Sequence, residues 1–216
     1  MKLINKVSNI FKKIAPYRIK TFYKKNFRKF NGVKKIDEKM LKYINYSNGY
    51  FIEMGAHDGV HNSNSLYFEK YKGWNGLLIE PSIYYNFLIK NRSKKNKFFN
   101  VGCSEFNGAT ETIFLETGDY SICKNLVDKN FFDWHLKKQY QAKKKILETK
   151  IKLRTLNSIL IESNAPKIID FFSLDVEGME MKVLEGVDFA YFNFKYLLVE
   201  CNDTNKFKKV FKYLNL

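Results

Sequence analysis

Glycines and acidic residues gather in two short stretches whose spacing suits the binding of a nucleoside. The first is Phe51-Ile-Glu-Met-Gly-Ala-His-Asp-Gly59, and the second is Gly76-Leu-Leu-Ile-Glu-Pro81. Glycine permits positive φ angles and close approach of the backbone to a ligand, and a carboxylate can accept hydrogen bonds from both hydroxyls of a ribose. Glu80 follows Gly55 by 25 residues, near the spacing of about 20 residues that nucleotide-binding folds use.

The glycine turn of the first stretch does not suit a pyrophosphate. Gly55 and Gly59 lack the G-x-G-x-x-G spacing of dinucleotide sites. The carboxylates of Glu53 and Asp58 would also repel phosphate groups. A cationic or zwitterionic adenosine ligand fits this turn better, and S-adenosylmethionine is the common ligand of that kind. We therefore expect S-adenosylmethionine as cofactor.

The elements that position these residues alternate between strand and helix. Apolar runs bounded by glycine or polar residues predict strands, and helical spacing of apolar residues predicts the segments between them. Such alternation indicates an α/β fold, with a mostly parallel sheet covered by helices on both faces. The predicted strands are 50–54, 77–79, 97–102, 109–115, 168–174 and 196–199, and the predicted helices are 34–46, 62–71, 84–92, 128–148, 155–161 and 205–216.

A second group of carboxylates follows the later strands. Asp175 and Glu177 come directly after the predicted strand 168–174, and Glu200 follows the strand 196–199. The carboxyl ends of parallel strands meet at one edge of a sheet, where such folds bind ligands. We expect Asp175 or Glu177 to act as a general base, although Glu177 equally suits a helix N-terminus. His57 is a third catalytic candidate.

We expect no metal at these carboxylates, which can form a cluster without an ion. If an ion did bind, their hard oxygen ligands would favour magnesium or calcium.

The chain of 216 residues has a net charge of +16, and that charge is unevenly placed. The first 30 residues hold 10 Lys and Arg and no acid, so the remainder carries 28 basic against 22 acidic residues. We divide the chain into a basic amphipathic segment, 1–32, and a catalytic domain, 33–216. A basic insertion at about 116–150 interrupts the regular alternation. Insertions beside a ligand site often act as lids or substrate walls, and the alternative is a surface helix with solvated lysines.

The basic N-terminal segment has three interpretations. Apolar residues from Leu3 to Ile14 recur at helical spacing until Pro16 ends the pattern. The segment can be a packing helix with solvated lysines, a helix that binds an anionic membrane surface through residues 1–30, or a nucleic-acid arm.

The cysteines and the hydropathy pattern bear on localisation. Cys103, Cys123 and Cys201 have no spacing typical of a disulfide framework or a zinc site. The chain has no run of 18 apolar residues and no continuous apolar stretch at its N-terminus. We expect a cytoplasmic protein that can be peripheral to the membrane and can form a homo-oligomer.

Several motifs, in their order along the chain, resemble those of the FkbM family of S-adenosylmethionine-dependent methyltransferases. The resemblance covers roughly residues 40–203 and implies a class I, Rossmann-like methyltransferase fold. It also implies methyl transfer to a hydroxyl oxygen of a sugar or other natural product. The motifs are Phe51-Ile-Glu-Met-Gly-Ala-His-Asp-Gly59, Ser63-Asn-Ser65, Trp74-Asn-Gly-Leu-Leu-Ile-Glu-Pro81, Asn91-Arg92, Leu156-Asn-Ser-Ile-Leu160, Asp170-Phe-Phe-Ser-Leu-Asp-Val-Glu-Gly178, Leu184-Glu-Gly186 and Leu197-Leu-Val-Glu200.

The resemblance also assigns cofactor contacts by position. The glycine turn would line the methionine end, Glu80 would bind the ribose hydroxyls, and the residues after the second and third strands would lie near the adenine. Asp175 would close the pocket. The expected contacts are Glu53, Gly55, Ala56, His57 and Asp58 in the turn, then Glu80, Pro81 and Ser82, then Val101, Gly102, Cys103 and Ser104, and finally Asp175.

One departure from the family pattern concerns the C-terminus. A complete class I sheet continues to an antiparallel strand pair, whereas residues 205–216 suffice only for a helix, so this pair is expected to be missing. The leading expectation for function is methylation of a glycan or lipid-linked glycan. The alternatives are a nucleic-acid (RNA) methyltransferase, for which the basic segments argue, and a binding scaffold without catalytic activity.

Overall fold

The computed structural model describes residues 16–106 and 111–214. Its main sheet is entirely parallel, with the strand order β3-β2-β1-β8-β9. The predicted apolar pattern from Leu3 to Ile14 lies outside the described residues. The strands of this sheet are β1 (Tyr50–Met54), β2 (Asn75–Ile79), β3 (Lys97–Phe99), β8 (Ile168–Leu174) and β9 (Asn193–Val199).

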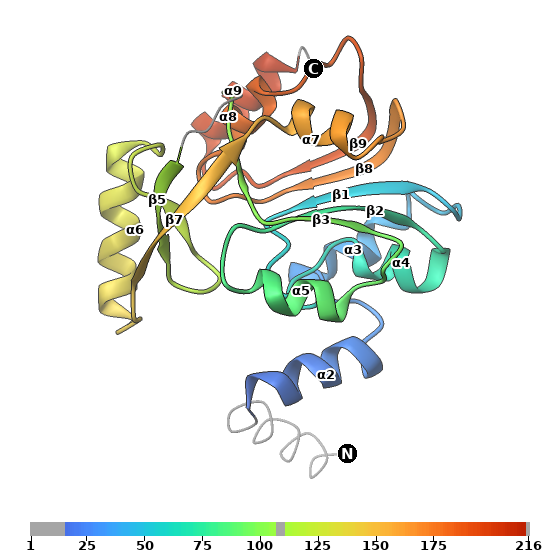
Figure 1. The fold of residues 1–216 in the computed structure, drawn as a ribbon, viewed down its shortest axis with the longest axis horizontal. Helices are drawn as coiled ribbons and strands as arrows, with labels where there is room; N and C mark the ends of the chain where they lie inside the picture. The colour runs from blue at the N-terminus through green and yellow to red at the C-terminus, as the bar shows by residue number, and fades with distance from the viewer. Residues whose placement is uncertain (1–15, 107–110, 215–216) are drawn as a thin grey trace.

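Helices cover both faces of the main sheet, as Figure 1 shows. Successive side chains of a strand point to opposite faces, so Phe51 and Ile52 of β1 belong to different core clusters, and both are fully buried. The Phe51 cluster joins the sheet to one helix layer, and the Ile52 cluster joins it to the other. These layers are α4 (Leu66–Lys72) with α5 (Tyr85–Asn91), and α7 (Leu156–Glu162) with α8 (Glu180–Glu185) and α9 (Thr204–Tyr213).

The strand order fixes where ligands bind. The chain runs outward from β1 to β3 and then returns to β8 on the other side of β1. In such sheets the crevice beyond the carboxyl ends of the strands, at this reversal, is the usual ligand site. The predicted α/β, Rossmann-like fold, with a mostly parallel sheet between two helix layers, is confirmed. Within the described residues no strand follows β9, so the antiparallel pair is absent from this part of the chain.

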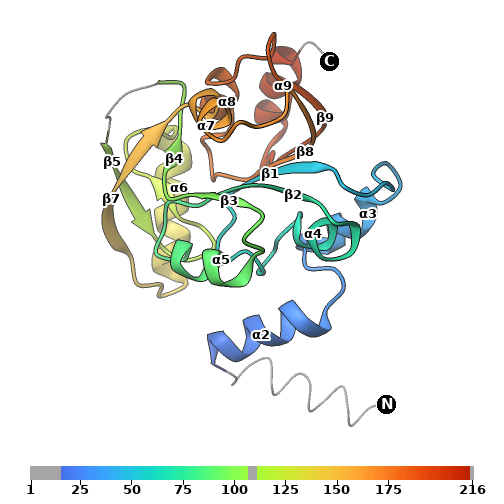
Figure 2. The ribbon, with the colours of Figure 1, turned by 45° about the vertical axis from the view of Figure 1, so that its right-hand side comes forward.

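A smaller second sheet stands beside the main one and carries the insertion (Figure 2). Its order is β4-β7-β5-β6, and β5 pairs antiparallel with both β7 and β6. Its strands are β4 (Gly102–Cys103), β5 (Glu111–Glu116), β6 (Ile122–Cys123) and β7 (Leu147–Arg154).

The prediction of one strand over 97–102 was therefore wrong. The chain leaves the main sheet after Phe99 and enters the second sheet at Gly102. At the crossing, the Asn100 side-chain amide donates hydrogen bonds to the backbone oxygens of Glu80 and Pro81.

Two predicted helices are shorter than expected. The predicted helix 128–148 is α6 (Lys129–Gln141), which Asp128 caps by accepting from the backbone N–H groups of Asn130 and Phe131. It ends just before Lys143, which adopts a left-handed conformation, and the chain then enters β7, which pairs with β5. The predicted helix 34–46 comprises only η1 (Val33–Lys35) and α3 (Ile36–Met40).

Helix α2 (Tyr17–Phe27) begins directly after Pro16, where the N-terminal apolar pattern ends. Both ribbon views place α2 outside the α4 and α5 layer. In the part of the chain that the structure describes, no helix has the length and apolar content needed to cross a bilayer.

Candidate active site

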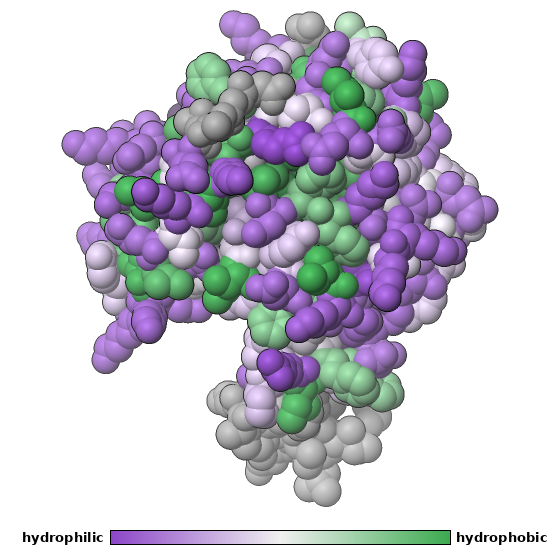
Figure 3. All heavy atoms as spheres, in the orientation of Figure 1, coloured by the Kyte–Doolittle hydropathy of each residue, from purple (hydrophilic) through white to green (hydrophobic). Residues whose placement is uncertain are grey.

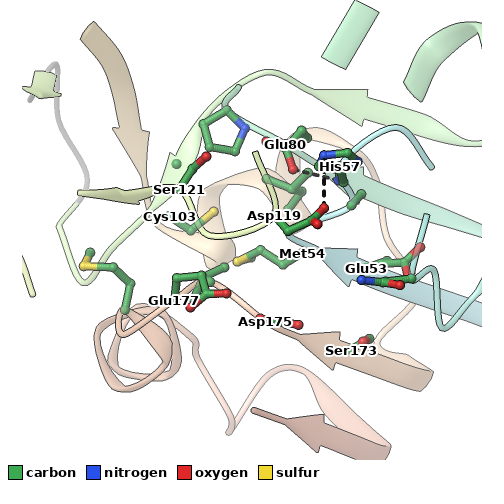
Figure 4. A pocket seen from close by; sticks show the side chains of 18 of the residues that line it. Glu53, Met54, His57, Glu80, Cys103, Asp119, Ser121, Ser173, Asp175 and Glu177 are labelled. Atoms are coloured by element: carbon green, nitrogen blue, oxygen red, sulfur yellow. Dashed lines mark hydrogen bonds and ion pairs between the residues drawn. The ribbon is translucent and has the colours of Figure 1, made fainter. Parts of the chain in front are cut away.

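A cavity opens at the carboxyl ends of β1, β2 and β8, where the second sheet meets the main sheet (Figure 4). It holds about 970 Å³ of space free of protein atoms, counting the part open to solvent. We call it the first cavity. The predicted site residues that line it are Glu53, Gly55, Ala56, His57, Glu80, Pro81, Val101, Gly102, Cys103, Asp175 and Glu177.

The glycine turn after β1 forms one wall of the first cavity. Gly55 has a φ of +76°, and a Cβ atom built there would lie 1.9 Å from the backbone oxygen of Asp175. Only glycine therefore lets the ends of β1 and β8 approach this closely. His57 also has a positive φ, +49°, a conformation that non-glycine residues adopt mainly where the surrounding structure enforces it.

Glu80 holds this turn in place. Its carboxylate accepts from the backbone N–H of His57 at 2.7 Å and from the backbone N–H of Ser82 at 2.9 Å. Each carboxylate oxygen keeps a further lone pair, and the side chain lines the first cavity. Glu80 can thus fix the turn and accept hydrogen bonds from a ligand at the same time.

Glu53 lines the first cavity, but the protein itself occupies both of its carboxylate oxygens. Ser63 Oγ, Ser65 Oγ and the backbone N–H of Asn64 donate to it at 2.6–2.8 Å. The buried guanidinium of Arg92 adds an ion pair at 3.1 Å. This network connects the end of β1 to the start of α4, so the structure gives Glu53 a mainly architectural role.

Three of the predicted cofactor contacts do not line the first cavity. Asp58 is fully buried and accepts hydrogen bonds from Tyr17 Oη at 2.6 Å and Thr21 Oγ1 at 3.0 Å. Ser82 and Ser104 are also buried, and their backbone N–H groups bond to Glu80 and to the backbone oxygen of Arg154. The resemblance had placed these residues at the ligand by position, whereas the structure uses them to fix the turns beside it.

Asp119 enters the first cavity from the loop between β5 and β6. Its Oδ1 lies 3.2 Å from His61 Nε2 and 3.7 Å from His57 Nε2, as the dashed line to His57 in Figure 4 indicates. The bond to His61 lowers the pKa of Asp119. The His57 ring also stacks on Tyr84 at 3.7 Å between centroids. We predicted this loop as part of a lid or wall but not Asp119 itself, because only the fold brings it to the histidines.

The carboxylates of Asp175, Glu177 and Glu200 converge as their positions after β8 and β9 predicted. One oxygen from each lies within 4.8 Å of the others. Desolvation by the surrounding protein, followed by the charges of Glu200 and Glu180, raises the pKa of Asp175 to about 7, although the residue keeps exposed surface at the cavity. Burial, followed by the charges of Glu200 and Asp175, raises the pKa of Glu177 to about 9. The raised pKa values mean that Asp175 is partly protonated and Glu177 largely protonated at neutral pH. The oxygens of all three groups are also of the kind that a divalent cation prefers.

Backbone conformation fixes the direction of the Glu177 side chain. Glu177 has a φ of +50°, and Gly178 follows at +100°. A glutamate with positive φ costs of order 1–3 kcal/mol, and such conformations gather at functional sites. In Figure 4 Glu177 and Asp175 lie apart from His57, which stands beside Glu80 and Asp119. The proposed catalytic residues therefore fall into two groups rather than one.

The second sheet supplies a further wall through Gly102 and Cys103, and Val101 joins it from the connection before β4. Burial raises the pKa of the Cys103 thiol to about 12, so the thiol is neutral at pH 7 and acts as an apolar surface. Phe114 and Ile151 extend this surface from β5 and β7. The cavity thus has acidic groups at two places and an apolar wall between the sheets.

Comparison with known proteins agrees with the fold and with the family that the sequence motifs resemble. A family model described as the methyltransferase FkbM domain matches residues 53–215. Neither the curated proteins nor the solved structures include a significant match. The matched region contains every strand of the main sheet except the first residues of β1, and it includes every predicted site residue. The chain therefore belongs to the FkbM family of methyltransferases.

Proposed function

We propose that the protein transfers a methyl group from S-adenosylmethionine to a hydroxyl of a sugar or glycan. The observation that carries this proposal is the arrangement of carboxylates around the first cavity. Glu80 lies by the glycine turn, and Asp175 and Glu177 lie at the end of β8. A ligand with ribose hydroxyls at one end and a positive charge at the other would match these groups.

The chemistry of the lining residues fits S-adenosylmethionine. Glu80 can accept from ribose hydroxyls, Val101 and Cys103 offer an apolar surface to an adenine ring, and the acidic end of the cavity favours a cation. When bound, this cofactor would supply an electrophilic methyl group on a sulfonium. The chain's own task is then to orient the acceptor hydroxyl and remove its proton.

Asp175 is the residue we assign to proton removal. A general base works best when its pKa lies near the operating pH, and the pKa of Asp175 is raised to about 7. Glu177, with a pKa raised to about 9, remains protonated at neutral pH and can donate a hydrogen bond to the acceptor. His57 then belongs to the cofactor end of the cavity, with Glu80 and Asp119.

Calorimetric titration with S-adenosylmethionine and S-adenosylhomocysteine tests the cofactor assignment. We expect a Kd on the order of micromolar for the wild type. Loss of a charged hydrogen-bond acceptor at Glu80→Gln or Glu80→Ala should weaken binding by about ten-fold or more. Glu185→Ala removes an exposed carboxylate on α8 and is the matched control.

Thermal unfolding of each Glu80 variant separates lost binding from lost folding. NAD binding in place of S-adenosylmethionine, or no binding by a folded wild type, would refute the assignment. Cofactor binding without transfer to any acceptor would instead indicate a binding scaffold.

We also propose that α2 rests on an anionic membrane surface, which would suit a lipid-linked glycan as acceptor. Tyr17 and Thr21 face inward to Asp58, while Ile19, Phe22 and Phe27 are 46%, 63% and 70% exposed. Basic residues flank these apolar side chains along the helix, and both kinds are visible at the lower end of Figure 3. Basic amphipathic helices of this composition bind anionic lipid surfaces.

Co-sedimentation with vesicles of phosphatidylserine and phosphatidylcholine tests this second proposal. We expect binding that the double variant Phe22→Ala/Phe27→Ala reduces. Phe207→Ala/Phe211→Ala removes two exposed rings from α9 and is the matched control. Equal binding to neutral vesicles, or retained binding by the α2 variant, would refute the proposal. Salt-dependent binding to RNA instead of vesicles would favour a nucleic-acid substrate.

A further inference from the structure

A second cavity lies beside the first, between α6 and the residues that follow β8 and β9. It holds about 1190 Å³ of space free of protein atoms, counting the part open to solvent. Its outer wall comes from α6 and the turn after it, together with Tyr120. Its inner wall comes from Glu177, Glu200 and Asn202.

Glu177 connects the two cavities, because it lines both of them. The packing of α6 explains this arrangement. A Cβ atom built on Gly178 would lie 3.0 Å from the Phe131 ring and 3.1 Å from Val127, so the start of α6 rests directly on the loop that carries Glu177. A ligand in the second cavity would therefore meet the same carboxyl group as a ligand in the first.

The outer part of the second cavity combines an aromatic surface with positive charge. Trp134 is 48% exposed and lines the cavity, and the Lys138 ammonium lies 3.8 Å from the centroid of its ring. Lys144, from the turn after α6, adds a second ammonium group to the lining. An indole offers a flat amphipathic surface to the C–H face of a sugar ring, and ammonium groups in the same lining attract a phosphate or carboxylate.

Both walls also offer groups that accept hydrogen bonds from hydroxyls. His135 is 2% exposed, lines the second cavity, and has no hydrogen-bond partner at Nε2. Burial lowers the pKa of His135, and the ring bonds to the backbone of Tyr120, which must involve Nδ1. The neutral ring thus keeps an acceptor lone pair at Nε2. Glu200, which accepts from the Asn202 amide at 3.2 Å, supplies a second acceptor.

We propose that the second cavity binds the methyl acceptor, and that this acceptor is a sugar carrying a negatively charged group. The charged group would lie at Lys138 and Lys144, the ring on Trp134, and the hydroxyls at His135 and Glu200. The hydroxyl that accepts the methyl group would point past Glu177 toward the first cavity. This assignment rests on the proposed transfer to a hydroxyl, and it adds the site and the charge of the acceptor.

Tryptophan fluorescence tests the proposal directly, because the chain has two tryptophans and only one of them lines this cavity. Trp74 is 2% exposed in the core, and Trp134 lies at the second cavity. The probes are glucose 6-phosphate and glucuronate, with glucose as the neutral comparison. We expect both anionic sugars to change the emission saturably with a Kd on the order of 1 mM or below, and glucose to bind at least ten-fold more weakly. Trp134→Phe should abolish the response.

Two lysine pairs provide the matched control. Lys138→Ala/Lys144→Ala removes two charges from the cavity lining, and Lys137→Ala/Lys145→Ala removes two exposed charges that do not line it. We expect the first pair to weaken binding of the anionic sugars by about ten-fold or more, and the second pair to leave the Kd within about two-fold. Equal effects of the two pairs would mean that net charge alone attracts the sugars, which overturns the proposal.

The calorimetric titration with S-adenosylmethionine distinguishes failure of this proposal from failure of the proposed function. Cofactor binding together with no response to either anionic sugar, or an equal response to glucose, overturns the acceptor assignment and leaves the cofactor assignment intact. A sugar response that depends on Lys138 and Lys144 supports the acceptor site even if S-adenosylmethionine does not bind.

Discussion

The hydroxyl of Tyr17 donates a 2.6 Å hydrogen bond to the buried carboxylate of Asp58. This bond ties α2, at the periphery of the fold, to the turn that carries His57. Burial alone would raise the pKa of Asp58, but the His57 ring, whose Nδ1 lies 3.7 Å away, and hydrogen bonds from Tyr17 and the backbone of His61 hold it well below its usual range. Asp58 is therefore a charged anchor for the helix, although its motif position suggested a contact with the ligand.

Removal of this hydrogen bond should destabilise the protein. Tyr17→Phe leaves a buried carboxylate with one donor fewer, which costs about 1–3 kcal/mol of unfolding free energy. Urea denaturation measures the change. Tyr140→Phe, which removes a hydroxyl from a side chain that is 68% exposed, should have no measurable effect. Equal stability of the two variants would show that α2 is not anchored through Asp58.

The raised pKa of Glu177 predicts a pH dependence of stability. Its pKa of about 9 in the folded protein exceeds the value of about 4.3 expected in the unfolded chain. The folded protein thus holds this proton more tightly than the unfolded chain does. The contribution of the protonated Glu177 carboxyl to the free energy of unfolding is complete at low pH, and it is lost as the pH rises through about 9. Between about pH 6 and pH 9, the melting temperature of the wild type should fall more steeply than that of Glu177→Gln.

An exposed glutamate provides the control for this measurement. Glu185→Gln should show the wild-type slope, because Glu185 is exposed on α8. If the Glu177→Gln slope also matched that of the wild type, the carboxylate would not be protonated at neutral pH.

Asp175→Asn should impair turnover. Loss of a general base typically costs about 10²–10⁴-fold in rate, and the wild-type rate should rise with pH through about 7, where Asp175 loses its proton. The measurement is transfer of a labelled methyl group from S-adenosylmethionine to an anionic sugar acceptor. Asp133→Asn, on the exposed side of α6, should leave the rate unchanged. Normal turnover by both Asp175→Asn and Glu177→Gln would exclude these carboxylates as the base.

Substitution of two glycines with similar φ angles distinguishes the stability cost of a steric clash from that of backbone strain. Gly55 and Gly118 have φ of +76° and +93°, but only at Gly55 would a Cβ atom collide with backbone, 1.9 Å from the Asp175 oxygen. At Gly118 the nearest atom would be 3.9 Å away. Gly118→Ala should cost about 1–2 kcal/mol from the left-handed conformation alone, and Gly55→Ala should cost more. Chemical denaturation of both variants checks this, and equal losses would mean that the strand ends can separate freely.

The strands of the main sheet could be predicted closely from the sequence. The predicted boundaries of β1 and β8, 50–54 and 168–174, are those observed, because strands buried on both faces read as short apolar runs between polar residues. The predicted helix 155–161 agrees with α7 to within one residue at each end, and Thr155 caps it by accepting from the backbone N–H of Ser158. Asp175, Glu177 and Glu200 converge for the same reason, since they follow these strands.

The second sheet and the insertion could not be predicted in this way. β4 and β6 contain two residues each, too few for a periodic pattern, and β7 begins within the lysine-rich stretch that read as helix. Asp119 and His135 come from this region, and their roles depend on contacts between segments distant in sequence. Sequence patterns describe local periodicity, whereas these positions are set by tertiary packing.

The place of Glu177 between the two cavities has a consequence for the energetics of binding. A ligand in either cavity that changes the protonation of Glu177 also changes the electrostatic field in the other. Thermodynamic linkage requires that the donor alter the affinity for the acceptor by the same factor as the acceptor alters the affinity for the donor. Binding of either ligand should also exchange protons with the solvent, so the heat of binding depends on the ionisation enthalpy of the buffer. Glu177 thus couples the two binding steps to each other and to the uptake or release of protons.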